Sequence, residues 1–462
     1  MIDGWKVATL FLLHVFAPIA HAAQDLQPGV LLPKITATHD ARQSYALYLP
    51  SNYTATKHWP IVYAFDPAAR GSLPVGLLKD AAEKYGYIVA GSNNSRNGSG
   101  QLEGQAARAM FDDTHSRLSI DDRRIYLAGF SGGARLSAEL AQHCACAAGV
   151  ILAGAGFQPA AQDPFAVFSV IGAYDFNYGE MIALDESLQK LSHPHFLRRF
   201  DGPHQWPDAN LFDEALAWLR LQSMKTGRES RDATYIAEQL ALETKRAQSF
   251  QCTDPFAAWF EYRQAAETFD SLTIAPSLRA EQKSLETQKA VLDAAKREKQ
   301  EIKQQDDLSS AIFTGFASLS QPNSSDTSPF ATARNSLREQ ILSLQSRAQH
   351  EKNPDKARVM KRALAGIFVA CMETGRTRQD ANDITRARDY FELAIAADPD
   401  SVWALTNLAV SRAADGDKKA ALVALRRTKQ KWTDRQAFSE WLNSEPSFAE
   451  IRDTPEFRSL LQ

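Results

Sequence analysis

Apolar stretches of strand length alternate with helical patterns between about residues 29 and 222. Residues 44–49 alternate in the manner of a half-buried strand, and residues 60–65 are continuously apolar, as in a strand covered on both faces. Similar strand-like runs follow at 87–91, 124–128, 149–153, 168–172 and 195–200, and helical patterns lie between them at 76–85, 102–118, 134–142, 180–191 and 207–221. This alternation predicts an α/β domain over 23–222, with a mostly parallel sheet flanked by helices.

The pattern changes after residue 222, where strand signals stop and charge density rises. We therefore predict a helical linker or hairpin region over 223–355. Within it, residues 277–308 form a strongly polar helix with an apolar stripe at heptad-like spacing, made by Leu278, Leu285, Leu292, Ala295 and Ile302. Residues 318–328 are rich in Ser, Asn, Asp and Pro, which predicts an exposed loop.

The C-terminal segment carries a repeat. Ala387 and Ala421 have the same spacing as Phe391 and Leu425, and this period of 34 residues resembles tetratricopeptide repeats over about residues 356–430. Arg412 departs from the pattern, since the first helix of such a unit usually carries an aromatic there. We predict an all-α repeat domain over 356–462 whose last helices form a cap. The resemblance implies a protein partner bound through the helical repeats.

The N-terminus has the features of a secretory signal peptide. Lys6 precedes an apolar run over residues 7–19, and Ala20-His21-Ala22 follows as a cleavage site of the A-x-A type. We predict a signal peptide over 1–22, export to the periplasm or the medium, and no membrane span after cleavage. An uncleaved N-terminal anchor is the alternative.

Composition narrows the function classes. The net charge is −3, and no basic cluster is present, so we predict no nucleic-acid partner. The four cysteines are Cys144, Cys146, Cys252 and Cys371. A bridge across the one-residue gap between Cys144 and Cys146 would be strained, so buried thiols are favoured there. No metal-ligand cluster, phosphate-binding loop or cofactor motif occurs, and we expect no cofactor.

The strongest chemical signal is a G-x-S-x-G motif formed by residues 129–133. It directly follows the strand-like run 124–128 and opens the helical pattern 134–142. Such a tight turn from strand to helix projects the hydroxyl of Ser131 beyond the edge of the sheet, with a helix N-terminus behind it. We therefore predict that Ser131 is a nucleophile.

A serine nucleophile needs a base and an acid, and both follow in the expected order. Asp175 comes just after the predicted strand 168–172, and His204 comes just after 195–200. We predict Asp175 as the acid and His204 as the base. The alternatives are weaker: Asp163, His193 and His195 lie at the wrong end of their strands, Asp201 is too close to His204, and Asp208 begins a helix.

These residues resemble those of the α/β-hydrolase superfamily. The histidine loop reads Gly-x-His-x-Trp-Pro at residues 202–207, which is similar to polyhydroxybutyrate-depolymerase-like and feruloyl-esterase-like esterases. The resemblance covers about residues 40–222. It implies an α/β-hydrolase fold and hydrolysis of an ester, small or polymeric, with Ser131, Asp175 and His204 as the triad.

Candidate oxyanion and substrate contacts follow from the same edge of the sheet. Gly132 should supply one N–H group, and Ala68, in the loop after residues 60–65, should supply the second because Pro67 has none. In that loop Asp66 and Arg70 could brace each other through an ion pair. Asn94 and Arg96, which follow the run 87–91, could contact substrate.

Two other functions stay open. One is a serine peptidase of the same fold, and the other is a catalytically weak scaffold that binds a partner through its helical repeats. A separate alternative concerns the polar helix 277–308, which could fold back over the site as a lid.

Overall fold

The computed structural model describes residues 26–98, 100–144, 146–319 and 328–461. The predicted signal peptide and most of the predicted loop 318–328 lie outside the described residues. The strands are β1 (Leu31–Thr36), β2 (Ser44–Tyr48), β3 (Trp59–Phe65), β4 (Ile88–Ser92), β5 (Ile120–Phe130), β6 (Ala147–Ala153), β7 (Ala166–Gly172) and β8 (His195–Phe200). The helices between and after them are α1 (Ser72–Tyr85), α2 (Gly100–Arg117), α3 (Gly132–Cys144), α4 (Tyr178–Lys190) and α5 (Ala209–Lys225).

The strands form one sheet in the order β1-β2-β4-β3-β5-β6-β7-β8. β2 runs antiparallel to both of its neighbours, and the six strands from β4 to β8 are parallel. This is the α/β-hydrolase fold, so the predicted fold class is confirmed. The edge strand β1 was not predicted because Pro33 and Lys34 interrupt its apolar pattern, and its pairing with β2 shifts register at Leu32/Ile35.

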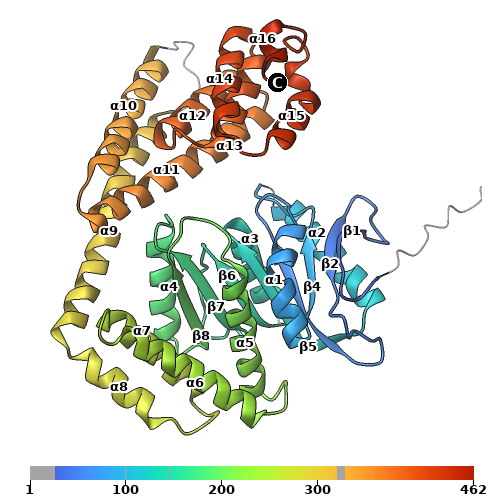
Figure 1. Cartoon of the computed structure of the whole chain (residues 1–462), viewed down its shortest axis with the longest axis vertical. Helices are drawn as coiled ribbons and strands as arrows, with labels where there is room; N and C mark the ends of the chain where they lie inside the picture. The colour runs from blue at the N-terminus through green and yellow to red at the C-terminus, as the bar shows by residue number, and fades with distance from the viewer. Residues whose placement is uncertain (1–25, 99, 145, 320–327, 462) are drawn as a thin grey trace, which may run out of the picture.

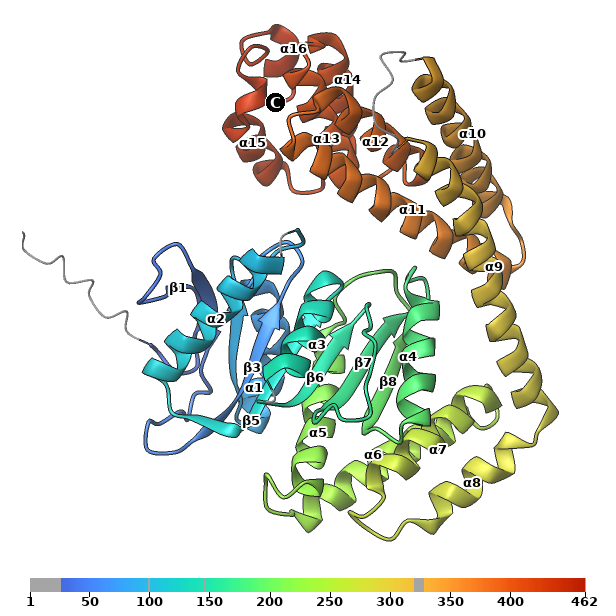
Figure 2. The same ribbon diagram turned by 180° about the vertical axis from the view of Figure 1, so that it is seen from behind.

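Helices cover both faces of the sheet. Helices α2, α3 and α4 lie on one face, and α1 and α5 lie on the other (Figures 1 and 2). Their buried side chains belong to two separate hydrophobic clusters. The parallel strands are therefore buried on both faces, which explains why β3, β6 and β7 are fully buried along their length. The carboxyl ends of β5 and its neighbours meet at one edge, where Gly129 pairs with Phe65 and Phe130 pairs with Ala153.

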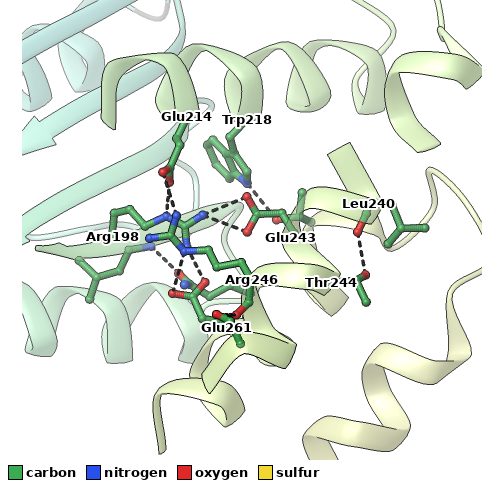
Figure 3. A network of polar contacts seen from close by, with 12 residues as sticks. Arg198, Glu214, Trp218, Leu240, Glu243, Thr244, Arg246 and Glu261 are labelled. Carbon is green, nitrogen blue, oxygen red and sulfur yellow. Dashed lines mark hydrogen bonds and ion pairs between the residues drawn. The ribbon is translucent and has the colours of Figure 1, made fainter. Parts of the chain in front are cut away.

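Two further helices, α6 (Ala233–Phe250) and α7 (Pro255–Phe269), attach to the sheet through a buried arginine. The side chain of Arg198 on β8 is only 1% exposed and forms ion pairs with Glu214 of α5, Glu243 of α6 and Glu261 of α7 (Figure 3). Burial opposes a charged guanidinium, but the three carboxylates outweigh that effect and raise the pKa of Arg198. A buried cation needs such partners, and α6 and α7 supply two of the three.

Helix α7 also contacts the outer edge of the sheet and the neighbouring helix α5. The Leu197 N–H on β8 donates to Gln264 Oε1 of α7 at 2.5 Å, and the indole N–H of Trp218 on α5 donates to Thr268 Oγ1 at 3.0 Å. A backbone N–H at the free edge of β8 thus has a side-chain acceptor, and the edge is covered against pairing with another strand.

The remaining helices form an all-α half. They are α8 (Pro276–Glu286), α9 (Lys289–Leu319), α10 (Ser328–His350), α11 (Pro354–Asp380), α12 (Ile384–Ala397), α13 (Val402–Ala414), α14 (Lys418–Lys431), α15 (Arg435–Ser444), the 3-10 turn η1 (Pro446–Phe448) and α16 (Pro455–Arg458). Figure 1 shows α9 running along one side of the molecule, from α8 up to the other helices, which lie above the sheet. The predicted polar helix 277–308 is thus divided between α8 and α9.

Helices α9–α16 share a hydrophobic core of their own. The residues that carry the predicted repeat, Ala387, Phe391, Ala421 and Leu425, are all fully buried in it. Consecutive helices from α11 to α14 pack against each other. The specific repeat family and its protein partner stay predictions.

Cys144 and Cys146 form a disulfide across the turn between α3 and β6. The expectation of buried thiols was therefore wrong: Cys144 ends α3 with an exposed side chain, and Cys146 directly precedes β6 and is half-buried. Cys252 is exposed, and Cys371 is buried. Among the described helices, none combines the length and the apolar character that crossing a membrane requires.

Candidate functional site

Ser131 lies in the sharp turn between β5 and α3. Its φ of 54° is in the left-handed region, which a residue with a side chain adopts only where the surroundings enforce it. A Cβ on Gly129 would lie 2.0 Å from the Gly133 carbonyl oxygen, and a Cβ on Gly133 would lie 2.1 Å from the Phe65 carbonyl oxygen. The two glycines of the motif are therefore required by close packing of the turn against itself and against β3.

The three predicted triad residues come together at the carboxyl edge of the sheet. Ser131 Oγ lies 3.0 Å from His204 Nε2, and His204 Nδ1 lies 2.8 Å from Asp175 Oδ2. The Asp175 side chain is 1% exposed and that of His204 is 12% exposed, so their hydrogen bond is shielded from water while the serine side chain stays partly accessible. This arrangement lets the imidazole accept the hydroxyl proton while the carboxylate stabilises the resulting cation.

The loop after β7 holds the carboxylate in place. Asp175 Oδ1 accepts the Asn177 N–H at 2.8 Å, and Asn177 Nδ2 donates to the Gly154 carbonyl at 2.7 Å. Gly154 itself has a φ of 65°, and a Cβ there would lie 3.0 Å from Asp175 Oδ2 and 3.1 Å from His204 Nδ1. Gly154 is thus a functional position that the sequence did not single out, and its signal was only a glycine directly after a strand.

Aromatic rings fix the imidazole from two sides. The ring of His204 lies 4.5 Å from the ring of Phe130 and 4.3 Å from that of Phe176, measured between centroids. Trp206, two residues later, donates its indole N–H to Asp66 Oδ2 at 2.8 Å. The tryptophan of the Gly-x-His-x-Trp-Pro loop therefore ties the histidine loop to the loop after β3.

An ion pair between Asp66 and Arg70 holds the loop after β3, as we expected from the sequence. Arg70 contacts both carboxylate oxygens of Asp66 at 2.9 Å, and the Asp66 side chain is fully buried. Burial alone would raise the pKa of Asp66, but hydrogen bonds from Arg70, Trp206 and the Ala68 N–H outweigh it and lower the pKa.

Ala68 does not serve as an oxyanion donor in this geometry. Its N–H donates to Asp66 Oδ1 at 2.8 Å, and the Arg70 N–H points to the same oxygen at 3.3 Å. The carboxylate thus takes the Ala68 N–H, which the prediction assigned to the oxyanion. Gly132 remains the oxyanion candidate, because it begins α3 and its N–H belongs to the first turn, where helical donors have no internal acceptor.

The predicted substrate contacts differ from the structure in part. Asn94 accepts the Ser44 N–H at 2.7 Å and donates to the Arg42 carbonyl at 3.0 Å, so its amide holds the turn after β4 against the start of β2. Arg96 is exposed, and its backbone bridges to Ala68. The neighbouring Asn97 lies closer to the triad, because a Cβ on Gly132 would meet its amide oxygen at 1.9 Å.

The alternative acids and bases lie in structural roles. Asp208 caps α5 by accepting the N–H groups of Asn210 and Leu211, and Asp201 is exposed. His195 and Arg263 both contact the buried Asp185, at 3.3 and 2.7 Å.

The helical half contacts the acid loop directly. The Phe176 carbonyl accepts a hydrogen bond from Gln305 of α9 at 2.6 Å, and the Ala173 carbonyl accepts one from Arg362 of α11 at 2.6 Å. A Cβ on Gly366 of α11 would lie 3.3 Å from Phe176 Cβ. Gln305 belongs to the segment 277–308 that was considered as a lid. No sequence pattern related α11 to the triad. This helix nevertheless contacts the acid loop through Arg362 and contacts Asn97, beside Gly132, through Glu373.

No protein-family model matches the chain, and no curated protein sequence is similar to it. Among solved structures the chain is similar to an S-formylglutathione hydrolase from Staphylococcus aureus, at 14% identity over 41% of this chain and 95% of that one, with a TM-score of 0.34. It is also similar to a ferulic acid esterase, at 17% identity over 40% and 94% with a TM-score of 0.34. Esterase B from Lactobacillus rhamnosis gives 14% identity over 45% and 93%, with a TM-score of 0.35. The proposal that follows rests on the geometry of the site.

Proposed function

We propose that the protein is a serine hydrolase that cleaves carboxylic esters through an acyl-enzyme on Ser131. The observation that carries this proposal is the continuous hydrogen-bonded line from Ser131 Oγ to His204 Nε2 at 3.0 Å and from His204 Nδ1 to Asp175 Oδ2 at 2.8 Å. The strained backbone of Ser131 supports it, since strain of this kind is retained where it places a reactive group.

Each step follows from these contacts. His204 Nε2 takes the proton of Ser131 Oγ as the oxygen attacks the ester carbonyl, and the Gly132 N–H faces the negative charge that develops on the carbonyl oxygen. The carbon–oxygen bond to the alcohol then breaks, and the alcohol leaves with the proton from His204. A water molecule, deprotonated by His204, next attacks the acyl carbon. The acid is released and the proton returns to Ser131.

The experiment is labelling of the full-length protein with a fluorophosphonate, paired with turnover of small esters and of matched anilides. We expect Ser131→Ala to lose labelling and to lower ester turnover by several powers of ten, with thermal unfolding unchanged. Ser192→Ala is the matched control, because Ser192 also has a left-handed backbone, with φ of 53°, but is exposed at the end of α4.

Two results would redirect the proposal. Faster cleavage of the anilides than of the esters would favour the peptidase alternative. A wild-type protein that neither labels nor turns over any ester would favour the scaffold alternative.

We also propose that the protein is exported and that cleavage after Ala22 leaves Ala23 as the first residue. The Cys144–Cys146 disulfide supports an oxidising compartment. Intact-mass measurement of the periplasmic and secreted fractions tests this. Protein that retains Met1 in the membrane fraction would instead indicate the uncleaved anchor.

A further inference from the structure

A surface cavity of about 550 Å³ lies at the amino edge of the sheet, opposite the triad. Its lining includes Asp122 and Arg123 near the start of β5, Cys146 just before β6, and Arg228 after α5. Since β5, β6 and β7 are parallel, this edge is the far end of the strands whose carboxyl ends carry the proposed hydrolase site. The cavity is therefore a second, separate feature of the domain.

The disulfide between Cys144 and Cys146 borders this cavity. Cys146 is half-buried and lines the cavity, while Cys144 is exposed at the end of α3. A disulfide stabilises a fold more when it closes a longer loop, and only one residue separates these two cysteines. Disulfides that solvent reaches are also the ones that thiols reduce most readily. This bridge is therefore better placed for exchange with thiols than for holding the fold together.

The charge around the cavity is mainly positive. The guanidinium of Arg123 donates to a backbone carbonyl at 2.7 Å, and that of Arg228 donates to a threonine hydroxyl at 2.8 Å. Within the part of the chain that the structure describes, neither arginine forms an ion pair with a carboxylate. Asp122 is the one acidic residue of the described lining, and it contacts His115 Nε2 at 3.2 Å. Two arginines against one aspartate attract an anion to the neighbourhood of Cys146.

We propose that the Cys144–Cys146 disulfide is a redox-active site that exchanges with small anionic thiols through a mixed disulfide on Cys146. A thiolate enters the cavity and attacks Cys146 Sγ. A new sulfur–sulfur bond forms there as the bond to Cys144 breaks, and Cys144 leaves as a thiolate. The C-terminus of α3 disfavours negative charge on Cys144, but the backbone N–H of Cys146 donates to Cys144 Sγ at 3.2 Å and can support the leaving thiolate.

A second thiolate completes the exchange. It attacks the sulfur of the bound thiol, so that the two small thiols become one disulfide and Cys146 leaves as a thiolate in the cavity that Arg123 and Arg228 line. The bridge gains two electrons from the two thiols, and the two protons that they release end on Cys144 and Cys146. None of these steps uses Ser131 or His204, so the inference goes beyond the proposed ester hydrolysis and does not depend on it.

The test measures how fast the bridge opens in the full-length protein, in a Cys252→Ser background that removes the exposed free thiol. Oxidised protein is mixed with 3-mercaptopropionate, which is anionic, or with cysteamine, which is cationic, at equal thiolate concentrations. N-ethylmaleimide stops the reaction, intact mass gives the rate, and peptide fragmentation locates the mixed disulfide. We expect the anionic thiol to react about tenfold faster at low ionic strength, with a smaller difference at high salt.

Replacing the two arginines tests the origin of this preference. Arg123→Gln combined with Arg228→Gln should bring the rates for the two thiols to within about twofold of each other. Arg338→Gln is the matched control, because Arg338 is exposed on α10 in the helical half, and it should keep the preference for the anionic thiol. Thermal unfolding of each variant checks that the fold is unchanged.

Two results would overturn the inference: equal rates for the two thiols in the protein with both arginines, or a mixed disulfide found on Cys144 instead of Cys146. The hydrolase is tested separately. We expect Ser131→Ala to keep the exchange rates, and Cys144→Ala with Cys146→Ala to keep ester turnover. Loss of ester turnover in the unmodified protein would count against the proposed function alone.

Discussion

The ring of Phe176 lies 4.3 Å from the imidazole ring of His204, centroid to centroid. The Phe176 carbonyl is held in turn by Gln305, which is 129 residues further along the chain. The imidazole of the proposed base therefore packs on a loop that a residue of the helical half holds through a hydrogen bond.

We expect Gln305→Leu to lower kcat by about tenfold with a smaller change in KM, because a loss near 1.4 kcal/mol in transition-state stabilisation corresponds to that factor. The substitution removes one buried hydrogen bond and lets the acid loop shift under His204. Steady-state kinetics and the rate of fluorophosphonate labelling measure the effect. Gln304→Leu, at the exposed neighbouring position, is the control and should change neither. A Gln305 variant with normal kcat and only a lower melting temperature would show that the contact merely stabilises the fold.

Asp175→Asn should lower kcat by about four powers of ten, because an amide stabilises the wrong imidazole tautomer. Asp208→Asn is the matched control. Asp208 caps α5, and asparagine caps helices as well as aspartate does, so activity and stability should stay near the wild-type values. The comparison is made by single-turnover hydrolysis. If Asp208→Asn or Asp201→Asn proves the more damaging change, Asp175 is not the catalytic acid.

Gly154→Ala should inactivate the protein and also destabilise it. An alanine at φ of 65° costs about 1–2 kcal/mol, and its methyl group would press on the Asp175–His204 pair at 3.0–3.1 Å. Gly416→Ala separates the two effects, because Gly416 has φ of 79° with nothing within 4 Å of an added Cβ. We expect both variants to lose stability in urea unfolding and only Gly154→Ala to lose labelling. Normal labelling of Gly154→Ala would mean that the triad tolerates the methyl group.

Asp66 should make stability depend on pH in the acid range. Its pKa is lowered in the folded state, so the unfolded chain binds the proton more tightly and acid favours unfolding. The contribution of Asp66 is therefore complete above about pH 4, near the ordinary pKa of an aspartate, and is lost as the pH falls through the lowered value. Wild-type protein should be about 1–3 kcal/mol more stable than Asp66→Asn at pH 7. Urea unfolding at a series of pH values should show that difference shrinking below pH 4, and a constant difference would contradict the assignment.

The sequence predicted the triad because each member follows its own strand, and the carboxyl ends of parallel strands meet at one edge. It could not predict the hydrogen bond from the Ala68 N–H to the Asp66 carboxylate, because the order of residues 66–68 does not determine which way that carboxylate points. Asn94 was misjudged for a similar reason, because its partner Ser44 lies on a strand 50 residues away.

The contact between α11 and the acid loop could not be predicted from the sequence. Arg362 and Ala173 are 189 residues apart, and helical periodicity reveals which face of α11 is polar or small but not what that face meets. The edge strand β1 was missed because its pattern is broken by Pro33, which an edge tolerates and a central strand does not.

The ion pairs of Arg198 bear on the order in which the domain can fold during synthesis. Its guanidinium is buried in β8, yet two of its three carboxylate partners, Glu243 and Glu261, and the amide that pairs the Leu197 N–H all come from later helices. During vectorial synthesis Arg198 would have Glu214 as its one carboxylate partner among the three, and β8 would keep an open edge, until about 65 more residues had emerged. We expect a nascent chain stalled just after α5 to be protease-sensitive, and one stalled after α7 to be protected. In that sense the sheet is completed by the segment that follows it along the chain.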